Sequence, residues 1–288
     1  MENTTKFAYR VSRISIFANT ALSAAKLSAG LIAHSGAMVS DAVHSASDVF
    51  STFIVMIGVR LAGKESDKEH PYGHERMECV AAIILSGILL ATGLMIGYQG
   101  VQKILHPEDL QVPGMLALAA AVLSIIVKEI MYQYTRKAAK QIDSDALMAD
   151  AWHHRSDALS SVGALIGIAG ARLGLPILDP IASLVICLFI ARAAYTIFRD
   201  AINKMVDESA DEETEAALRA CAMAYPGVMG IDRLMTRKFG SRMYVEMEIS
   251  VDGNMTLTAA HAIAEGVHGE IEQQFPRVKH IMIHVNPA

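Results

Sequence analysis

The sequence predicts a polytopic α-helical membrane protein with six transmembrane helices and a small α/β domain at the C-terminal end. The chain has 288 residues, of which 52% are hydrophobic and 19% are charged, and its mean hydropathy is +0.33. A soluble protein of this size is normally less apolar. The apolar residues also gather in long blocks that stop near residue 206, and the pattern after that point is different.

Six blocks are long enough to cross a bilayer, which takes about 20 residues of helix. They cover residues 11–33, 36–62, 78–102, 113–135, 145–170 and 176–198. The first block is too long for a cleavable signal peptide, so we count it as a span. Lysine and arginine concentrate at the N-terminus and in every second connection. The positive-inside rule therefore predicts that both termini are cytoplasmic and that residues 1–206 form a transmembrane domain.

Residues 207–288 read as a separate cytoplasmic module. The segment SADEETEAALRACAMA has an acidic first turn followed by apolar spacing typical of a helix, and LTAAHAIAEGVHGEIEQQF predicts a second helix. MYVEMEISV and HIMIHV alternate apolar and polar residues as half-buried strands do. The stretch DRLMTRKFGSRMYV is expected to supply a hairpin partner for the first of these strands, with the turn near Gly240. The predicted order is helix, strand, strand, helix, strand, with both helices on one side of the sheet.

Ionisable residues stand at helical spacing inside two of the membrane segments. The first stripe consists of Asp41, His44 and Asp48, and the second of Asp150, His153 and Asp157. Each stripe lies on one face of a helix with 3.6 residues per turn. Ionisable groups are costly in lipid and face a protein interior, a partner charge or a water-filled path. We therefore expect the two stripes to meet at one site.

Imidazole and carboxylate groups in this pattern indicate a divalent metal. His44, Asp48, His153 and Asp157 provide four ligands suited to tetrahedral Zn²⁺, and the two carboxylates cancel the charge of the ion. The alternative is that these residues bond to one another across helices, as polar residues in membrane bundles do. The HxxxD pattern occurs twice, which favours the metal. Asp41 and Asp150 are either accessory ligands or structural residues.

Four further polar residues interrupt the apolar segments. Lys128 and Glu129 lie in segment 113–135. They either extend to the cytoplasmic surface or pair with the polar face of segment 145–170, and the sequence leaves both open. His154 and Arg155 point away from His153 on a helix, so we expect them to reach the membrane surface or to contact another helix.

The chain resembles the cation diffusion facilitators, a family of bacterial divalent-metal/proton antiporters. The resemblance rests on the six apolar segments, on HSASD and HHRSD, on the loop DKEHPYGHER, and on AAHAI and IMIHVNP near the end. It implies a homodimer in the bacterial inner membrane whose cytoplasmic domain has a metallochaperone-like ferredoxin fold. It also implies Zn²⁺ efflux in exchange for protons, because the family members with His and Asp on both helices prefer zinc. Mn²⁺ and Fe²⁺ stay open as alternatives, and so does Cd²⁺.

The resemblance implies two further metal sites. In the loop, Asp67, His70 and His74 match a zinc site, although spacing alone favours a solvated charged loop; a short helical turn would bring the three together. In the cytoplasmic domain the matching positions are Asp232, Glu248, His261 and His284. Asp232 and Glu248 replace histidines of the family, and Asn286 replaces an aspartate, so a weaker or single-ion site is implied. Zn²⁺ there would be structural or regulatory.

Arg76 and Asp207 match a charge pair that joins the two domains in the family. An ordinary surface salt bridge, which contributes little to stability, is the other interpretation.

Several function classes are disfavoured by the sequence. HER at residues 74–76 lacks the second histidine of a zinc protease, and no GxxxxGK[ST] loop is present. An enzyme is not expected, because no nucleophile and base stand out, and a net charge of −5 argues against nucleic acid as a partner. The remaining rival to a transporter is a membrane-anchored metal sensor or scaffold.

Overall fold

The computed structural model describes residues 2–32, 36–105, 115–172 and 177–288. Within these ranges, the description leaves out the side chains of residues 2–5, 29–30, 36–44, 46–47, 115–118, 120–121, 164, 167–172, 178–179 and 182. The chain divides into two compact units, Met1–Ala201 and Ile202–Ala288. Each unit is described by itself.

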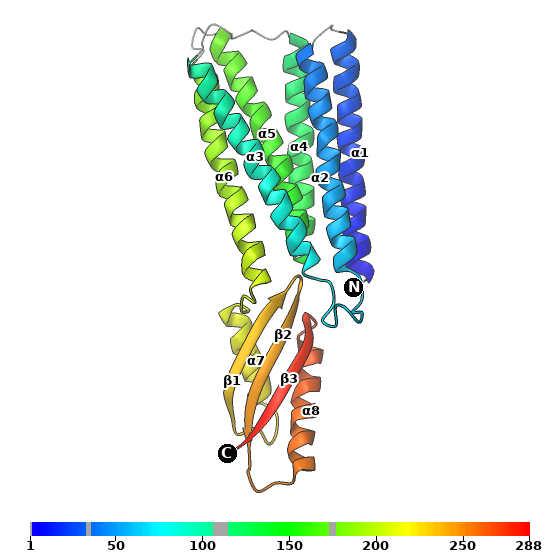
Figure 1. Cartoon of the computed structure of the whole chain (residues 1–288), viewed down its shortest axis with the longest axis vertical. Coiled ribbons are helices and arrows are strands. Elements are labelled where there is room, and N and C mark those ends of the chain that lie inside the picture. The colour runs from blue at the N-terminus through cyan, green and yellow to red at the C-terminus, as the bar shows by residue number, and fades with distance from the viewer. Residues whose placement is uncertain (1, 33–35, 106–114, 173–176) are drawn as a thin grey trace. The chain divides into compact units, whose positions relative to one another are not determined.

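Six long helices run side by side in the first unit (Figure 1). They are α1 (Glu2–Ile32), α2 (Gly36–Ala62), α3 (Met77–Leu105), α4 (Met115–Ile142), α5 (Asp145–Arg172) and α6 (Leu178–Met205). Each overlaps one of the predicted segments, and the predicted ends at residues 33, 113–114 and 176 lie outside the described residues. The helices α1, α4 and α6 extend beyond the apolar blocks, because lysine, arginine and glutamine are good helix formers and continue the helix outside the apolar region.

Only one described helix, α3, is apolar enough by length and composition to cross a membrane. In α5, Asp150, Arg155 and Asp157 interrupt the apolar stretch. The prediction of helices at these six places is confirmed, whereas the six spans stay a prediction.

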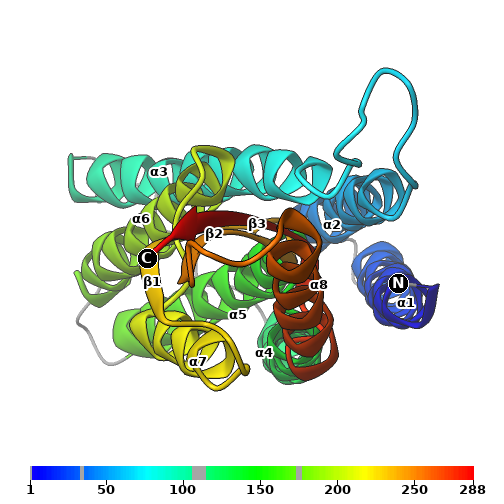
Figure 2. The same ribbon diagram turned by 90° about the horizontal axis from the view of Figure 1, so that it is seen from below.

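Four helices surround a common interior. The pairs α1 with α2 and α4 with α5 make the most extensive contacts, and α2 also contacts α5 while α1 contacts α4. Figure 2, which looks along the bundle, shows these four helices next to one another. Side chains from all four can therefore meet inside the unit.

The helix α3 packs closely against α2 on one side and α6 on the other, and glycines make both approaches possible. A Cβ added at Gly58 of α2 would overlap the Cβ of Ala81 on α3. A Cβ added at Gly97 of α3 would lie 2.6 Å from Sγ of Cys187 on α6. Small residues at such contacts let membrane helices approach each other and gain van der Waals packing.

The second unit has the predicted order of elements. They are α7 (Glu212–Met223), β1 (Gly230–Phe239), β2 (Arg242–Val251), α8 (Leu257–Gln274) and β3 (Val278–Pro287). The sheet has the order β1-β2-β3, with β1 and β2 antiparallel and β2 and β3 parallel. The hairpin turns at Gly240, whose φ of 61° lies in the left-handed region that glycine tolerates. The side chains of Asp211 and Thr256 cap the two helices.

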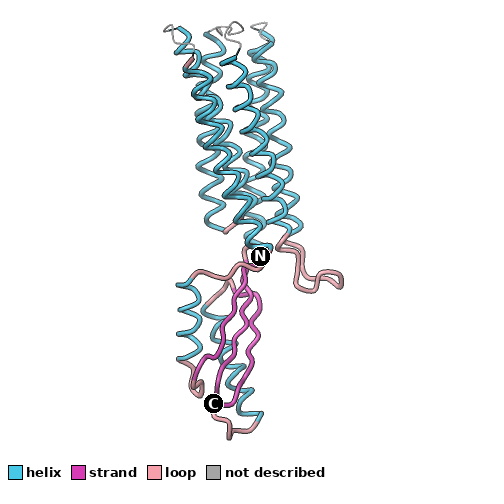
Figure 3. Tube along the Cα trace, turned by 60° about the vertical axis from the view of Figure 1, so that its left-hand side comes forward, coloured by secondary structure: helices cyan, strands magenta, loops and turns pink. Residues whose placement is uncertain are grey.

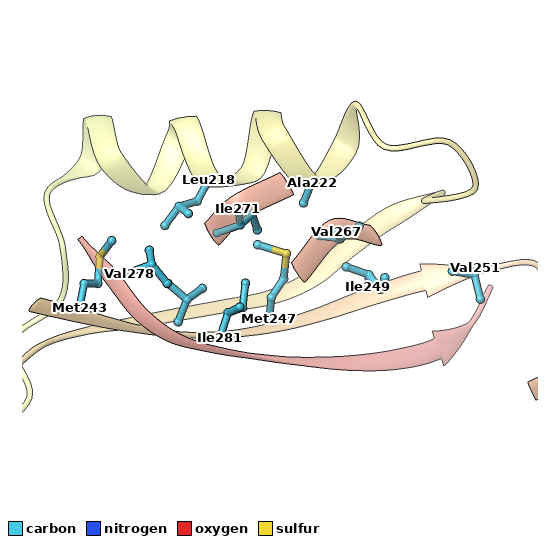
Figure 4. Packing of buried hydrophobic residues seen from close by; sticks show 11 residues of the cluster. Leu218, Ala222, Met243, Met247, Ile249, Val251, Val267, Ile271, Val278 and Ile281 are labelled. Atoms are coloured by element: carbon cyan, nitrogen blue, oxygen red, sulfur yellow. The ribbon is translucent and has the colours of Figure 1, made fainter. Parts of the chain in front are cut away.

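The core of the second unit lies between the sheet and both helices. The five apolar residues predicted to share one face of β2 are all buried, namely Met243, Val245, Met247, Ile249 and Val251. Figure 4 shows Leu218 of α7 and Ile271 of α8 packed toward the strands. The opposite face of β2 carries Glu246 and Glu248, so the sheet has one buried and one polar face.

Candidate metal centre

Three of the four predicted transport-site residues, Asp48, His153 and Asp157, meet inside the bundle. One ligand atom each from Asp48 on α2 and from His153 and Asp157 on α5 lie within 4.8 Å of one another. All three residues are buried. Nε2 of His153 lies 3.4 Å from Oδ1 of Asp48. A tetrahedral ion with ligands at ~2.1 Å has ligand atoms about 3.4 Å apart, so this pair already has the spacing of two zinc ligands.

His44 and Asp41 lie on α2, but their side chains are outside the described part of the chain. The helix is continuous from Gly36 to Ala62, which places His44 one turn before Asp48 on the same face. The assignment of His44 as the fourth ligand and of Asp41 as an accessory ligand stays a prediction.

Lys128 of α4 occupies the space between the two carboxylates. Its Nζ donates hydrogen bonds to Oδ2 of Asp48 at 2.5 Å and to Oδ2 of Asp157 at 2.8 Å. A third bond goes to Oδ1 of Asn19 on α1, at 2.9 Å. The residue is 1% exposed. The ammonium thus joins α1, α2, α4 and α5 at one point.

This geometry decides between the two interpretations of Lys128. The residue lies near the middle of α4 (Met115–Ile142), and its ammonium faces the candidate ligands instead of extending to a surface. Sequence reasoning assigned no role to Asn19. The available signal for the Lys128 contacts was a lysine at a similar depth to two acidic residues on neighbouring helices. Buried charges are normally paired, so such a lysine indicates an ion pair.

Asp150 lies on α5 outside the group of three. Oδ1 of Asp150 accepts a hydrogen bond from Thr52 of α2 at 3.3 Å. Its Oδ2 lies 3.5 Å from Nε2 of His154, and both residues are fully buried. Of the two alternatives for His154, a place at the membrane surface is therefore wrong, and its contact with Asp150 lies within α5. Among the described residues, the two His154 nitrogens and Asp150 Oδ2 have no hydrogen-bond partner. Asp150 and His154 therefore form a buried polar pair next to the candidate metal ligands.

Arg155 makes the contact between helices that the sequence predicted. Its guanidinium pairs with Glu129 of α4 and lies over the ring of Tyr132, 4.8 Å from the centroid. The ion pair and the cation–π contact hold α4 against α5. Since Glu129 and Lys128 are neighbours, this contact also fixes the part of α4 that carries Lys128.

The loop between α2 and α3 brings the second predicted group together. One ligand atom each from Asp67, His70 and His74 lie within 4.8 Å of one another. Nδ1 of His70 is 3.4 Å from Oδ1 of Asp67, and Nε2 of His74 is 3.5 Å from Oδ2 of Asp67. The three residues therefore have the spacing of metal ligands, although exposed polar groups also gather without an ion.

The helical turn expected here does not form. Residues 63–76 make turns and bends, drawn as the pink loop between two helices in Figure 3. Asp67 organises them, since its Oδ1 accepts from the backbone N–H of Glu69 at 3.1 Å and of His70 at 2.8 Å. The Lys64 ammonium bonds to Oδ2 at 2.6 Å. These bonds, led by the one from Lys64, hold the pKa of the Asp67 carboxyl well below its usual range.

The group predicted in the second unit does not converge within one chain. Glu248 of β2 and His284 of β3 are neighbours across the parallel strands, and Asp232 lies on β1. His261 is exposed on α8 and faces Glu265 instead. The amide of Asn286 donates to Asp232 at 2.9 Å and to Glu248 at 3.5 Å. Among the described residues these four are not one of the groups spaced for an ion.

Arg76 and Asp207 belong to different units, so the predicted pair between them stays a prediction. Asp207 follows α6 and has a φ of 64°, a left-handed conformation that aspartate adopts more readily than most residues. This conformation marks the point where the chain leaves α6.

The buried group in the bundle brings together candidate metal ligands from two helices. Imidazole nitrogen and carboxylate oxygen are the donors that Zn²⁺ takes, and carboxylates also suit Mn²⁺ and Fe²⁺. The ligands come from α2 and α5, so a relative movement of these helices changes the site. Such an arrangement can bind a cation and release it when the helices move.

Comparisons with known proteins agree with this chemistry. Residues 12–206 match the model of the cation efflux transmembrane domain, and residues 210–288 match that of the cation efflux protein cytoplasmic domain. The chain is 35% identical to metal tolerance protein C1 of Arabidopsis thaliana, over 97% of its own length and 62% of that protein. It is 31% identical to the manganese efflux system protein MneP of Bacillus subtilis (strain 168), over 96% of this chain and 95% of MneP.

A solved structure of the MamM-CTD is 26% identical to this chain, covers 27% of it and 98% of the MamM-CTD, and has a TM-score of 0.26. The family assignment rests on the transmembrane match, which extends over more than half of the chain, and on the similarity to MneP along nearly the whole of both proteins. The protein therefore belongs to the cation efflux family, the cation diffusion facilitators.

Proposed function

We propose that this protein exports a divalent metal cation from the cytoplasm, with Zn²⁺ as the preferred ion and protons as the counter-ion. The observation that carries the proposal is the buried group of Asp48, His153 and Asp157, formed by two helices of the transmembrane domain. His44 is the proposed fourth ligand. An ion bound there meets two carboxylates, which balance its double charge without help from water.

Competition between metal and protons provides the coupling. A metal binds neutral imidazole and ionised carboxylate, so binding releases any protons that these groups hold. Zn²⁺ from the cytoplasm displaces protons from the histidines, the helices shift to open the site outward, and protons from outside then expel the ion. The bundle returns with the protons bound.

Mn²⁺ efflux is the second candidate, and Fe²⁺ follows the same reasoning. MneP, the relative at 31% identity, is named a manganese efflux protein. Oxygen ligands suit these harder ions better than imidazole does. Asp150 adds a carboxylate beside the site and accepts a hydrogen bond from Thr52 of α2, and Asp41 is a proposed accessory ligand on the same stripe as Asp48. The ratio of Zn²⁺ to Mn²⁺ affinity separates the two candidates.

We also propose that the protein is a homodimer in the bacterial inner membrane, with both termini in the cytoplasm. The model that matches residues 210–288 carries the name ZT_dimer. The polar face of the sheet presents Asp232, Glu248 and His284 beside exposed Met282. A second chain placed there would add its own ligands to a set that one chain leaves incomplete. Light scattering on the purified protein measures this state.

Transport by everted membrane vesicles tests the main proposal. These vesicles turn the cytoplasmic face outward, so export appears as uptake. Vesicles with the unaltered protein are expected to accumulate Zn²⁺ when their interior is made acidic, and to stop when an ionophore collapses the pH gradient. Asp157→Ala is expected to reduce uptake to the background. Asp200→Ala, which alters an exposed aspartate paired with Arg199, is the matched control and is expected to transport normally.

Each contrary outcome has its own meaning. Uptake by Asp157→Ala at the normal rate would show that the site is assigned wrongly. A protein that binds Zn²⁺ but never transports it under any gradient would favour the metal sensor.

A further inference from the structure

Lys128 places a positive charge where the metal has to bind. Its Nζ contacts Oδ2 of Asp48 and Oδ2 of Asp157, at 2.5 and 2.8 Å, and these carboxylates belong to the candidate ligand group. An ion bonded to the same two oxygens at ~2.1 Å would occupy nearly the position of the ammonium. The two cations therefore exclude each other, both sterically and through charge repulsion.

The ammonium is fully engaged by these oxygens. It has three N–H donors, and the bonds to Asp48, Asp157 and Asn19 use all of them. Lys128 is 1% exposed and Asp48 is 2% exposed, so water does not solvate the pairs. Two buried carboxylates with no cation nearby would repel each other and would lack the solvation they have in water. The two carboxylates therefore need a cation beside them even when no metal is bound.

We propose that Lys128 is a built-in counter-cation that occupies the transport site when no metal is bound, and that a divalent ion binds by displacing the ammonium from Asp48 and Asp157. This inference rests on the proposed function. On displacement the ammonium leaves the two carboxylates and Oδ1 of Asn19 on α1, so its three bonds belong to the metal-free site. Asn19 is not a proposed ligand, so its bond to the ammonium stabilises only the metal-free state.

The exchange gives Lys128 two effects on transport. It weakens metal binding, because the ion has to compete with a cation that is already tethered at the site. It also keeps the empty site compensated, which allows the metal-free bundle to change conformation without two unpaired buried carboxylates. An ion that binds too tightly is not released, so the lysine favours turnover at the expense of affinity.

Calorimetric titration of the purified full-length protein with Zn²⁺ at a fixed pH tests the inference. His70→Ala serves as the common background, because it removes a ligand from the loop group. Lys128→Gln is expected to bind Zn²⁺ more tightly; if the ammonium occupies the oxygens in about 90% of metal-free molecules, the apparent Kd falls about tenfold. Lys128→Arg keeps the charge and is expected to retain weak binding. Lys137→Gln, an exposed lysine on the same helix, is the matched control and is expected to change nothing.

A second variant answers the question if Lys128→Gln does not fold. Asn19→Ala removes one acceptor of the ammonium and leaves every candidate ligand and every charge in place. Displacement then becomes easier, so Zn²⁺ is expected to bind more tightly than in the background protein. A lysine with a purely structural role predicts unchanged or weaker binding in Asn19→Ala and in Lys128→Gln.

Asp157→Asn separates failure of this inference from failure of the proposed function. If Asp157→Asn weakens Zn²⁺ binding while Lys128→Gln and Asn19→Ala do not tighten it, the counter-cation role is overturned and the transport site stands. If Asp157→Asn leaves Zn²⁺ binding unchanged, the site itself is wrong and the inference falls with it.

Discussion

Nε2 of His153 on α5 lies 3.4 Å from Oδ1 of Asp48 on α2, and both side chains are buried. Oγ of Ser51, which follows Asp48 on α2 by one turn, is also 3.3 Å from the same nitrogen. The imidazole is thus placed by α2 although it belongs to α5. Under the proposed function, His153 provides an imidazole ligand, which favours Zn²⁺ over harder ions.

His153→Asn is predicted to change metal preference rather than abolish binding. An amide oxygen replaces the imidazole nitrogen, which weakens Zn²⁺ binding more than Mn²⁺ binding. We expect the ratio of Zn²⁺ to Mn²⁺ affinity to fall by about tenfold or more, which corresponds to a difference of ~1.4 kcal/mol or more in binding free energy. Competition titrations with Zn²⁺, Mn²⁺, Fe²⁺ and Cd²⁺ measure the ratio. His268→Asn on α8 is the control. An unchanged ratio in His153→Asn would show that the His153 imidazole is not a metal ligand.

Gly58→Ala is predicted to destabilise the bundle. The added methyl group would overlap the Cβ of Ala81 on α3, and alanine has no side-chain torsion that could relieve the overlap. The helices α2 and α3 must separate, at a cost of about 1–3 kcal/mol. Gly87→Ala on α3 is the matched control, because nothing lies within 4 Å of its added Cβ. Thermal unfolding in detergent should show a lower midpoint for Gly58→Ala only; equal midpoints would contradict the close contact.

The loop of residues 63–76 is predicted to keep its structure in mild acid. The Lys64 ammonium and the His70 backbone N–H lower the pKa of Asp67, so the carboxylate favours the folded loop above its ordinary pKa of ~3.9. The stabilisation is lost only as the pH falls through the lower pKa of the folded state. Hydrogen exchange at the Glu69 and His70 amides should therefore stay slow from pH 7 down to about 4.5.

Asp67→Ala provides the comparison for the loop. It removes the acceptor of both amides and of Lys64, so exchange at Glu69 and His70 should be fast at every pH. Protection that disappears in the unaltered protein near pH 5 would show that Asp67 does not organise the loop.

Ile271→Ala is predicted to destabilise the second unit by about 2–5 kcal/mol, because it leaves a cavity under α8. The side chain is fully buried between α8 and the sheet. Met282→Ala on β3 removes a side chain that is 59% exposed and should change stability by less than about 0.5 kcal/mol. Hydrogen exchange of residues 207–288 in the full-length protein measures both. Similar values for the two variants would contradict the packing.

Local patterns were sufficient to predict most elements of the fold. Apolar blocks located all six long helices, and strict alternation from Met243 to Val251 identified the buried face of β2, because strand side chains point to opposite faces in turn. The boundaries were less predictable. The polar residues of α4 beyond residue 135 continue the helix to Ile142, and hydropathy carries no information about helix formation there.

In the loop, the three predicted residues lie together, but the segment does not form the predicted helical turn. Spacing suggested a helical turn for Asp67, His70 and His74. Pro71 and Gly73 within the segment favour turns instead, and Gly73 has a φ of 96°. Asp67 then gathers the segment by accepting backbone N–H groups, as aspartate does in turns.

The role of Lys128 could not be predicted from local sequence. Its partners Asp48 and Asp157 are 80 and 29 residues away, and no local pattern encodes such pairings. The sequence showed only that a lysine interrupts an apolar segment, which is compatible with a surface contact as well as a buried ion pair. Helix packing places its ammonium between the carboxylates.

Anomalous diffraction at the zinc absorption edge from crystals of the full-length protein grown with Zn²⁺ is the most direct measurement of the transport site. We predict a peak bonded to Asp48, His153 and Asp157, with the ammonium of Lys128 no longer in contact with either carboxylate. A zinc-saturated crystal with no peak between α2 and α5, and with Lys128 still bonded to Asp48 and Asp157, would contradict the site.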